Sequence, residues 1–298
     1  MSKKFIVLAG ALALALTACN GGGNGDDGNG DTDNTGGDAD TSINIAVSGT
    51  LSLHPISQGI NDAVVAMSGS AITFGDGTGI TIFIVDPVTA LSPGFNITTD
   101  NLAMGGPTAC TADGCTWSFP EVDISGLSLG LVALITDSNE TPAFEATNVG
   151  IFGAGTATAL KDTPEDQTDV PLFAVTLESA MHLAALTSGD YAAMKAAGYL
   201  YGSMVSAAFA PVAGVTVTVA EADAAKITDL VYPTAASGFS ASGDATDATG
   251  FFMAVGTAPA ALVGMSAAGT GSETWNNGDP ITVGTQAGTA FVLFWIAD

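Results

Sequence analysis

Hydrophobic and polar residues alternate with a period of two where the polar N-terminal region ends. The alternating apolar positions are Ile43, Ile45, Val47, Leu51 and Leu53, and this spacing predicts a half-buried β-strand. Further strand-like runs follow at short intervals, separated by Gly, Asp and Pro turn residues. These runs cover residues 63–67, 80–85, 116–119 and 127–135. Short strands at such intervals are typical of an antiparallel β-sandwich.

The pattern changes in the middle of the chain. Residues 138–169 have weak periodicity and several Gly and Pro residues, which predicts a connector with an edge strand or two. Residues 176–186 and 190–197 are rich in Ala, Leu and Met. They predict two short helices, with Thr176 as N-cap and Gly198 at the C-terminal stop. Strand patterns resume afterwards and cover residues 199–205, 215–219, 250–255 and 290–296.

These patterns predict a mainly β protein of two antiparallel β-sandwich domains joined by a short helical segment. The first sandwich covers residues 43–137, the connector 138–197 and the second sandwich 198–298. Residues 19–42 are rich in Gly, Asp, Asn and Thr. A segment with so few apolar residues cannot offset the entropy of ordering, so we expect a flexible linker there.

The N-terminus has the layout of a secretory signal peptide. Lys3 and Lys4 precede the apolar stretch Phe5–Leu16, which falls short of the ~20 residues that a membrane-spanning helix needs. The next residues, Leu16-Thr17-Ala18-Cys19, resemble the lipobox of bacterial lipoproteins. The alternatives are an ordinary secreted protein with a chance cysteine, or an uncleaved anchor helix.

The lipobox resemblance implies that residues 1–18 are removed and that Cys19 becomes the lipidated N-terminus. Its thiol then carries a diacylglycerol and its amine an acyl group such as palmitate, and several chains on one residue are enough for stable anchoring. In lipoproteins an Asp after the cysteine usually marks inner-membrane retention, whereas this chain has Asn20. We therefore expect an outer-membrane location, on the periplasmic or the cell-surface face.

The charge balance of the chain limits the classes of partner that it can bind. The chain has five Lys, no Arg and 30 acidic residues, for a formal net charge of −25. So few cations cannot build a phosphate-binding patch, which argues against nucleic acid as a partner. Attraction to anionic headgroups is excluded on the same ground, so membrane association depends on the lipid at Cys19. The acidity mostly favours solubility, and binding of Ca²⁺ or a cationic partner is the weaker interpretation.

Two cysteines remain beyond Cys19, in the stretch Cys110-Thr111-Ala112-Asp113-Gly114-Cys115. Asp-Gly between short flanks is a strong hairpin signal, and the two strands leaving such a turn bring the cysteines side by side. In an oxidising compartment Cys110 and Cys115 should form a disulfide. A redox or metal role needs more ligands than the sequence offers at this point.

The second predicted sandwich carries a family resemblance. Its motifs are Gly202-Ser203-Met204-Val205, Ala210-Pro211-Val212-Ala213-Gly214 followed by Val215–Val219, and Thr246-Asp247-Ala248-Thr249-Gly250-Phe251-Phe252. As a set, which covers about 60 residues, they resemble carboxypeptidase regulatory-like domains, which have a transthyretin-like or Cna-B-like sandwich. The first sandwich shows a fainter version without the Pro-x-x-Gly turn. The resemblance implies a non-enzymatic binding or scaffolding role and no particular ligand.

The search for chemistry gives few candidates. His54 and His182 lie far apart in the chain, and no metalloprotease, nucleophile-elbow or phosphate-loop spacing occurs. His54 is best interpreted as a polar side chain at a strand end, and His182 as a packing or capping residue on its helix. Acidic clusters could bind Ca²⁺, although surface solvation is the simpler interpretation. Trp275 lies in a polar turn and is the one plausible exposed ligand contact.

The sequence thus predicts no enzyme, no cofactor and no metal site. It favours a lipid-anchored envelope lipoprotein that serves as a structural or binding module at the outer membrane, with an unidentified protein or glycan partner. The main alternative is an extracellular carbohydrate- or Ca²⁺-binding lipoprotein that uses Trp275 and nearby carboxylates.

Overall fold

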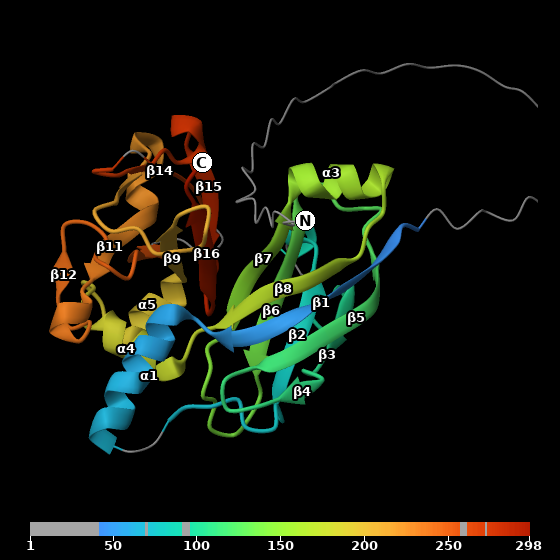
Figure 1. The fold of residues 1–298 in the computed structure, drawn as a ribbon, viewed down its shortest axis with the longest axis horizontal. Helices are drawn as coiled ribbons and strands as arrows, with labels where there is room; N and C mark the ends of the chain where they lie inside the picture. The colour runs from blue at the N-terminus through green and yellow to red at the C-terminus, as the bar shows by residue number, and fades with distance from the viewer. Residues whose placement is uncertain (1–41, 69–70, 91–95, 257–260, 272) are drawn as a thin grey trace, which may run out of the picture.

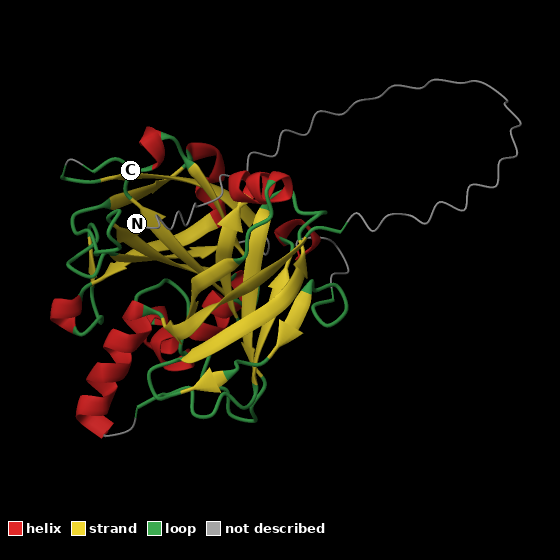
Figure 2. Ribbon diagram, turned by 45° about the vertical axis from the view of Figure 1, so that its right-hand side comes forward, coloured by secondary structure: helices red, strands yellow, loops and turns green. Residues whose placement is uncertain are grey.

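The computed structural model describes residues 42–298, apart from residues 69–70, 91–95, 257–260 and 272. Strands dominate this part of the chain (Figures 1 and 2), which confirms the predicted mainly β class. The predicted linker and signal peptide lie outside the described residues, except for Ser42. No helix among the described residues is long and apolar enough to cross a membrane.

The strands of the described residues form three sheets. In spatial order, the four-stranded sheet contains β4 (Ala109–Cys110), β5 (Cys115–Asp123), β1 (Asn44–Leu53) and β8 (Gln167–Ala174). The three-stranded sheet contains β10 (Thr216–Val219), β14 (Ala261–Ala268) and β15 (Ile281–Thr285). The nine-stranded sheet contains β12 (Ser242–Gly243), β11 (Ile227–Pro233), β13 (Phe251–Gly256), β9 (Tyr199–Val205), β16 (Ala290–Ile296), β7 (Thr147–Gly153), β6 (Gly130–Asp137), β2 (Ile80–Val85) and β3 (Ala103–Gly105).

Helices lie between and beside the strands (Figure 2). The α-helices are α1 (Pro55–Ser68), α2 (Pro87–Ala90), α3 (Ala154–Asp162), α4 (Leu177–Ala184) and α5 (Tyr191–Ala197). Short 3₁₀ helices complete the elements of the described chain, namely η1 (Glu221–Lys226), η2 (Ala235–Ser237) and η3 (Asn276–Gly278).

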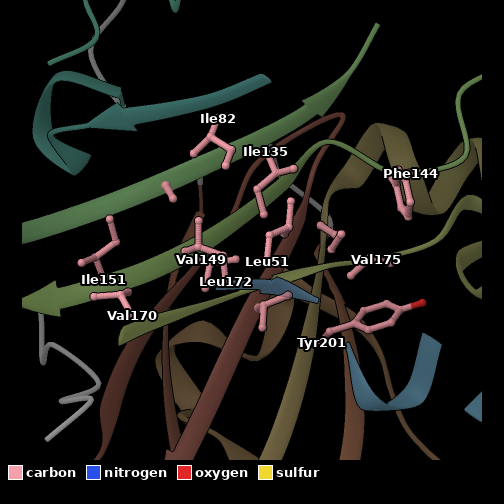
Figure 3. Close-up of a cluster of buried hydrophobic side chains, with 14 of the residues drawn as sticks. Leu51, Ile82, Ile135, Phe144, Val149, Ile151, Val170, Leu172, Val175 and Tyr201 are labelled. Carbon is pink, nitrogen blue, oxygen red and sulfur yellow. The ribbon is translucent and has the colours of Figure 1, made fainter. Parts of the chain in front are cut away.

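The two predicted sandwiches share the nine-stranded sheet. The four-stranded sheet covers one part of it through a large buried core, and the three-stranded sheet covers the other part through a second core. Figure 3 shows the first core, where Leu51 and Leu172 meet Val149. The long sheet joins strands from residues 43–137, 138–197 and 198–298, and the division of the chain at these boundaries stays a prediction.

The last strand, β16, links the two parts of the long sheet. It runs parallel to β9 over its whole length and parallel to β7 from Ala290 to Val292. β1 and β8 are also a parallel pair, and the remaining pairs of the described strands are antiparallel as predicted. The continuous apolar run of residues 290–296 fits this central position, because a strand covered on both faces has no polar side.

Strand β13 shows the same double burial. Phe251 points into the first core and Phe252 into the second, and both rings are buried. Successive side chains of a strand point to opposite faces of the sheet, so the turn before β13 supplies one aromatic ring to each core. Gly250 in that turn has φ +66°, and a Cβ there would lie 2.4 Å from the backbone oxygen of Met204.

One strand prediction is wrong and two helix predictions are confirmed. Residues 63–67 belong to helix α1, which begins at Pro55 and places Ile56 and Ile60 on its buried side. Proline is favoured in the first turn of a helix, and the spacing of the two isoleucines is helical. The expected helices are α4 and α5. Thr176 caps α4 by accepting from the Ser179 N–H, and Gly198 ends α5.

The predicted connector contains full sheet strands. β8 is an edge strand, as expected, but β7 is internal and lies between β6 and β16. Helix α3 also falls in this region and was not predicted. The weak periodicity of residues 138–169 reflects burial of β7 on both faces, because only Gly150 is exposed in its burial pattern.

Candidate functional site

The predicted disulfide is present. Cys110 and Cys115 are paired neighbours on β4 and β5, and the turn between them is closed by a 2.8 Å hydrogen bond from the Thr111 N–H to the Gly114 oxygen. The geometry confirms the hairpin prediction made from Asp113-Gly114. Cys19, the predicted lipidation site, lies outside the described residues.

Trp275 is not an exposed contact residue, so that prediction is wrong. Its side chain is 2 % exposed and belongs to the second core. An antiparallel bridge between Trp275 and Ala297 ties this turn to the end of the chain, and the indole packs inward although its sequence neighbours are polar. The gain from burying so large an apolar surface explains why the indole overrides the polar turn.

His54 lies directly after the end of β1, as expected. It is fully buried, and its ring is surrounded by the aromatic rings of Phe173, Tyr201, Phe251 and Phe294, with centroids 5.5–6.2 Å away. Burial lowers the pKa of His54 to about 3, so the imidazole is neutral at physiological pH. His182 is exposed, and its Nε2 lies 3.0 Å from the oxygen of Gly238, which directly follows η2. This contact joins α4 to a distant segment and does not cap the helix of His182 itself.

The His54 ring contacts a serine, and the direction of the hydrogen bond decides what this pair can do. Nδ1 accepts from the Ile56 N–H at 3.3 Å, and Nε2 lies 3.2 Å from Ser203 Oγ. A neutral imidazole that accepts at Nδ1 carries its proton on Nε2. Nε2 therefore donates to Ser203, and His54 has no lone pair left with which to activate that hydroxyl as a nucleophile.

Two further buried polar groups lie nearby. Ser57 Oγ and Ser179 Oγ are 2.7 Å apart and join α1 to the start of α4. The Glu145 carboxylate, 1 % exposed, forms a 3.0 Å ion pair with Lys195 and accepts from the Tyr191 hydroxyl. Partial burial opposes the charge of Lys195, but its hydrogen bonds to Glu145 and Tyr191 outweigh that effect and raise its pKa.

These polar groups hold elements together. Each partner comes from a different element, and the ion pair joins the segment before β7 to α5. Buried charges are tolerated when they are paired and hydrogen-bonded, and sequence reasoning did not identify Glu145 because a single Glu beside Phe144 gives no motif. No group of three or more His, Cys, Asp or Glu side chains in the described part of the chain could hold a metal ion.

An apolar cavity of about 200 Å³ lies between the two parts of the long sheet. Strands β2, β6, β7 and β8 line one side, and β14, β15 and β16 line the other. In Figure 1, β7 and β16 lie side by side and diverge toward the end of β7 that leads into α3. Among the described residues, no charged side chain lines this cavity.

Phe209 stands out in the cavity wall. Its side chain is 41 % exposed, and its backbone adopts φ +60°. A positive φ is uncommon for a bulky residue, and an exposed large aromatic ring held in such a conformation is a feature that binding sites often carry. Sequence reasoning missed this residue because the run Ala207-Ala208-Phe209-Ala210 has neither a turn signature nor a motif.

Comparison with known proteins gives only distant structural matches. No model of a known protein family matches the chain, and no curated protein is similar to it. Three solved structures that it resembles are the TIE protein of Bacillus anthracis, a streptococcal ancillary pilin, and GBS52, the minor pilin of Streptococcus agalactiae.

Identity to these three is 8 %, 9 % and 11 %, with TM-scores of 0.22, 0.23 and 0.24. The matches cover 86 %, 85 % and 85 % of this chain, and 34 %, 68 % and 95 % of the others. This chain therefore spans about a third of the TIE protein. Because the TM-scores are so low, we transfer no function from these structures.

Proposed function

We propose that the chain is a lipid-anchored lipoprotein of the bacterial envelope whose folded part is a non-enzymatic structural or binding module at the outer membrane. The observation that carries this proposal is the tetrapeptide Leu16-Thr17-Ala18-Cys19 behind a short apolar stretch. The disulfide between Cys110 and Cys115 supports it, because such bonds persist in exported proteins.

The chemistry of the buried groups supports a non-enzymatic role. His54 donates to Ser203 rather than accepting from it, and Glu145 is already engaged by Lys195 and Tyr191. A general base or nucleophile must be able to reach a substrate proton or atom, whereas these groups are buried and committed to structural partners.

The proposed module in residues 198–298 is of the carboxypeptidase regulatory-like kind. Its motif residues behave as such a hairpin requires, since Gly214 has φ +75° and the Asp247 carboxylate accepts from the Thr249 N–H at 2.8 Å. The alternative of a carbohydrate- or Ca²⁺-binding protein has lost its supporting residue, because Trp275 is buried. We therefore keep the structural or binding module as the proposal.

The anchor is tested by Cys19→Ala in the native host, followed by membrane fractionation and lipid labelling. We expect the variant to lose the acyl label and to appear as an unprocessed or released species. A Cys110→Ala/Cys115→Ala variant is the control, because it removes the other thiols and should stay membrane-bound. Mature-sized Cys19→Ala protein in the membrane fraction would contradict the anchor. Proteinase treatment of intact cells then shows which face carries the folded part.

A further inference from the structure

The nine-stranded sheet is split within one strand pair. β7 and β16 are in register from Thr147 and Ala290 to Val149 and Val292, and among the described residues their pairing ends there. Both strands continue, β7 through residues 150–153 and β16 through residues 293–296. About half of the backbone groups in each continuation point toward the gap, because the groups of successive residues point to opposite sides of a strand. At the end of β16 the bridge between Trp275 and Ala297 closes this edge, and the Asp298 N–H donates to the Thr274 oxygen.

The apolar cavity lies in this split. Gly150, Ile151 and Phe152 line it from β7, and Leu293 and Phe294 line it from β16. The residues at which β7 and β16 no longer pair with each other therefore also line the cavity. A fatty acyl chain could fill the volume, but it offers no donors or acceptors to two rows of backbone groups. An extended peptide offers both.

Gly150 adds an independent observation. Its ideal Cβ position has no atom within 4 Å, and it is the exposed residue in the middle of an otherwise buried strand. Glycine inside a strand often marks a bulge or a place where another backbone approaches closely, and the β6–β7 register does shift next to Gly150. Because a strand Cβ points out of the plane of the sheet, this free space lies over the face of β7, next to the strand edge that lacks its β16 partner.

The walls define the chemistry of the occupant. Ile151, Val170 and Phe294 lie toward the first core, whereas Val132 and Phe291 lie toward the opposite face of the sheet. An inserted strand would meet apolar side chains on both faces, so its own residues should be aliphatic throughout. Although the chain has 30 acidic residues, the described lining of the cavity carries no charge, so the inserted residues should also be uncharged.

We propose that the split between β7 and β16 binds an extended, uncharged, aliphatic segment of another polypeptide as an added strand of the long sheet. Four residues at the spacing of a β-strand span about 13 Å, so the recognised core is four or five residues long. This inference deepens the binding role proposed above, but it does not depend on the lipid at Cys19.

The test is hydrogen exchange on the full-length protein in solution, with and without a peptide pool. The probe is a synthetic pool of hexapeptides built from Val, Ile, Leu and Ala, with Lys only outside this core for solubility. We expect slower exchange of backbone amides in residues 150–153 and 293–296. The same pool with alternate backbone nitrogens methylated should bind about tenfold or more weakly, because it cannot donate to the strand edges.

Gly150→Leu fills the open space in front of β7 and should abolish the protection. Gly126→Leu is the matched control, because the Cβ position of Gly126 also has no atom within 4 Å but lies outside the cavity. Circular dichroism of both variants checks that they fold, and the methylated pool tests the idea without any variant.

Three results would overturn the proposal. The first is unchanged exchange at millimolar peptide, and the second is equal binding of the methylated pool. The third is that decanoate fills the cavity and blocks the peptides without protecting the amides, which would assign the site to acyl chains. Protection that rises with protein concentration in the absence of peptide would make the occupant a second copy. Anchoring is measured separately, by membrane fractionation. Failure of the peptide test therefore leaves the lipoprotein proposal standing, and failure of the anchoring test leaves the peptide proposal standing.

Discussion

Acid should destabilise this protein through His54, and the size of the effect follows from its burial. An unfolded histidine has a pKa of 6.5, whereas burial lowers the pKa of His54 in the folded state to about 3. Between these two pKa values, the His54 imidazole is protonated in the unfolded chain and neutral in the folded protein. Protonation of the unfolded chain favours unfolding, so the folded protein keeps its full stability above pH ~6.5 and loses stability as the pH falls toward ~3.

The linkage relation converts these two pKa values into free energy. Between pH ~7.5 and pH ~4.5, protonation of His54 in the unfolded chain should lower the free energy of unfolding by about 3 kcal/mol. For a chain of this size, that corresponds to a drop of about 5–10 °C in melting temperature. The acidic side chains titrate in the same range, so the wild-type curve alone cannot isolate His54.

The assay is therefore a comparison of urea unfolding in wild-type protein and His54→Phe over this pH range. Phenylalanine suits the aromatic surroundings but leaves Ser203 and the Ile56 N–H without their partner, which should cost about 1–3 kcal/mol at neutral pH. At pH ~4.5 the free energy of unfolding of the wild type relative to the variant should be about 3 kcal/mol lower than at neutral pH, so the wild type loses its advantage or becomes the less stable protein. A control substitution at exposed His182, His182→Phe, keeps His54 and should preserve the shift. A difference that stays constant with pH would refute the reasoning.

Three other substitutions test the structural assignments. Replacing Cys110 and Cys115 by Ala should cost about 2 kcal/mol, from the chain entropy of the small loop they close, and reducing agent should shift the urea midpoint of the wild type but not of the variant. Trp275→Ala removes a buried side chain and should lower the free energy of unfolding by about 3–5 kcal/mol, and Trp275→Phe should lower it less. An unchanged urea midpoint in Trp275→Ala would place the indole at the surface instead. Lys195→Met should lower the free energy of unfolding by about 1–3 kcal/mol, because it leaves the buried Glu145 carboxylate without its cation, and the partial exposure of the ammonium keeps the loss this small. The double variant with Glu145→Gln should recover part of the loss. A melting temperature unchanged in Lys195→Met would show that the ion pair does not stabilise the fold.

Local chemistry was predictable from the sequence. Asp113-Gly114 identified the hairpin that joins the two cysteines, and Thr176 and Gly198 marked helix ends correctly. These signals act over a few residues, and the residue type alone satisfies the backbone group concerned. Helix α1 was missed because Val64, Val65 and Met67 also suit a strand, and only the Pro55 start and the spacing of Ile56 and Ile60 favoured a helix.

Burial of single side chains was harder to predict, since tertiary partners decide it. Trp275 lies among polar residues, yet its indole belongs to the second core. His54 follows an alternating strand, yet four aromatic rings from distant segments enclose it. Neighbours in sequence show the local polarity of a segment. They do not show which distant segment packs over it, and the cavity escapes sequence reasoning for the same reason.

The shared sheet arises from a parallel pairing, which sequence patterns do not encode. A hairpin is signalled by its turn, but parallel neighbours such as β16 and β9 are joined through many intervening residues. The apolar run Phe291-Val292-Leu293-Phe294-Trp295 predicted a strand, and the structure shows that this strand is central and packs against both cores. Because β16 joins β9 along its full length and β7 for only three residues, the strand that unites the two sandwiches also leaves the split between them. The central strand and the proposed peptide site are thus consequences of one pairing.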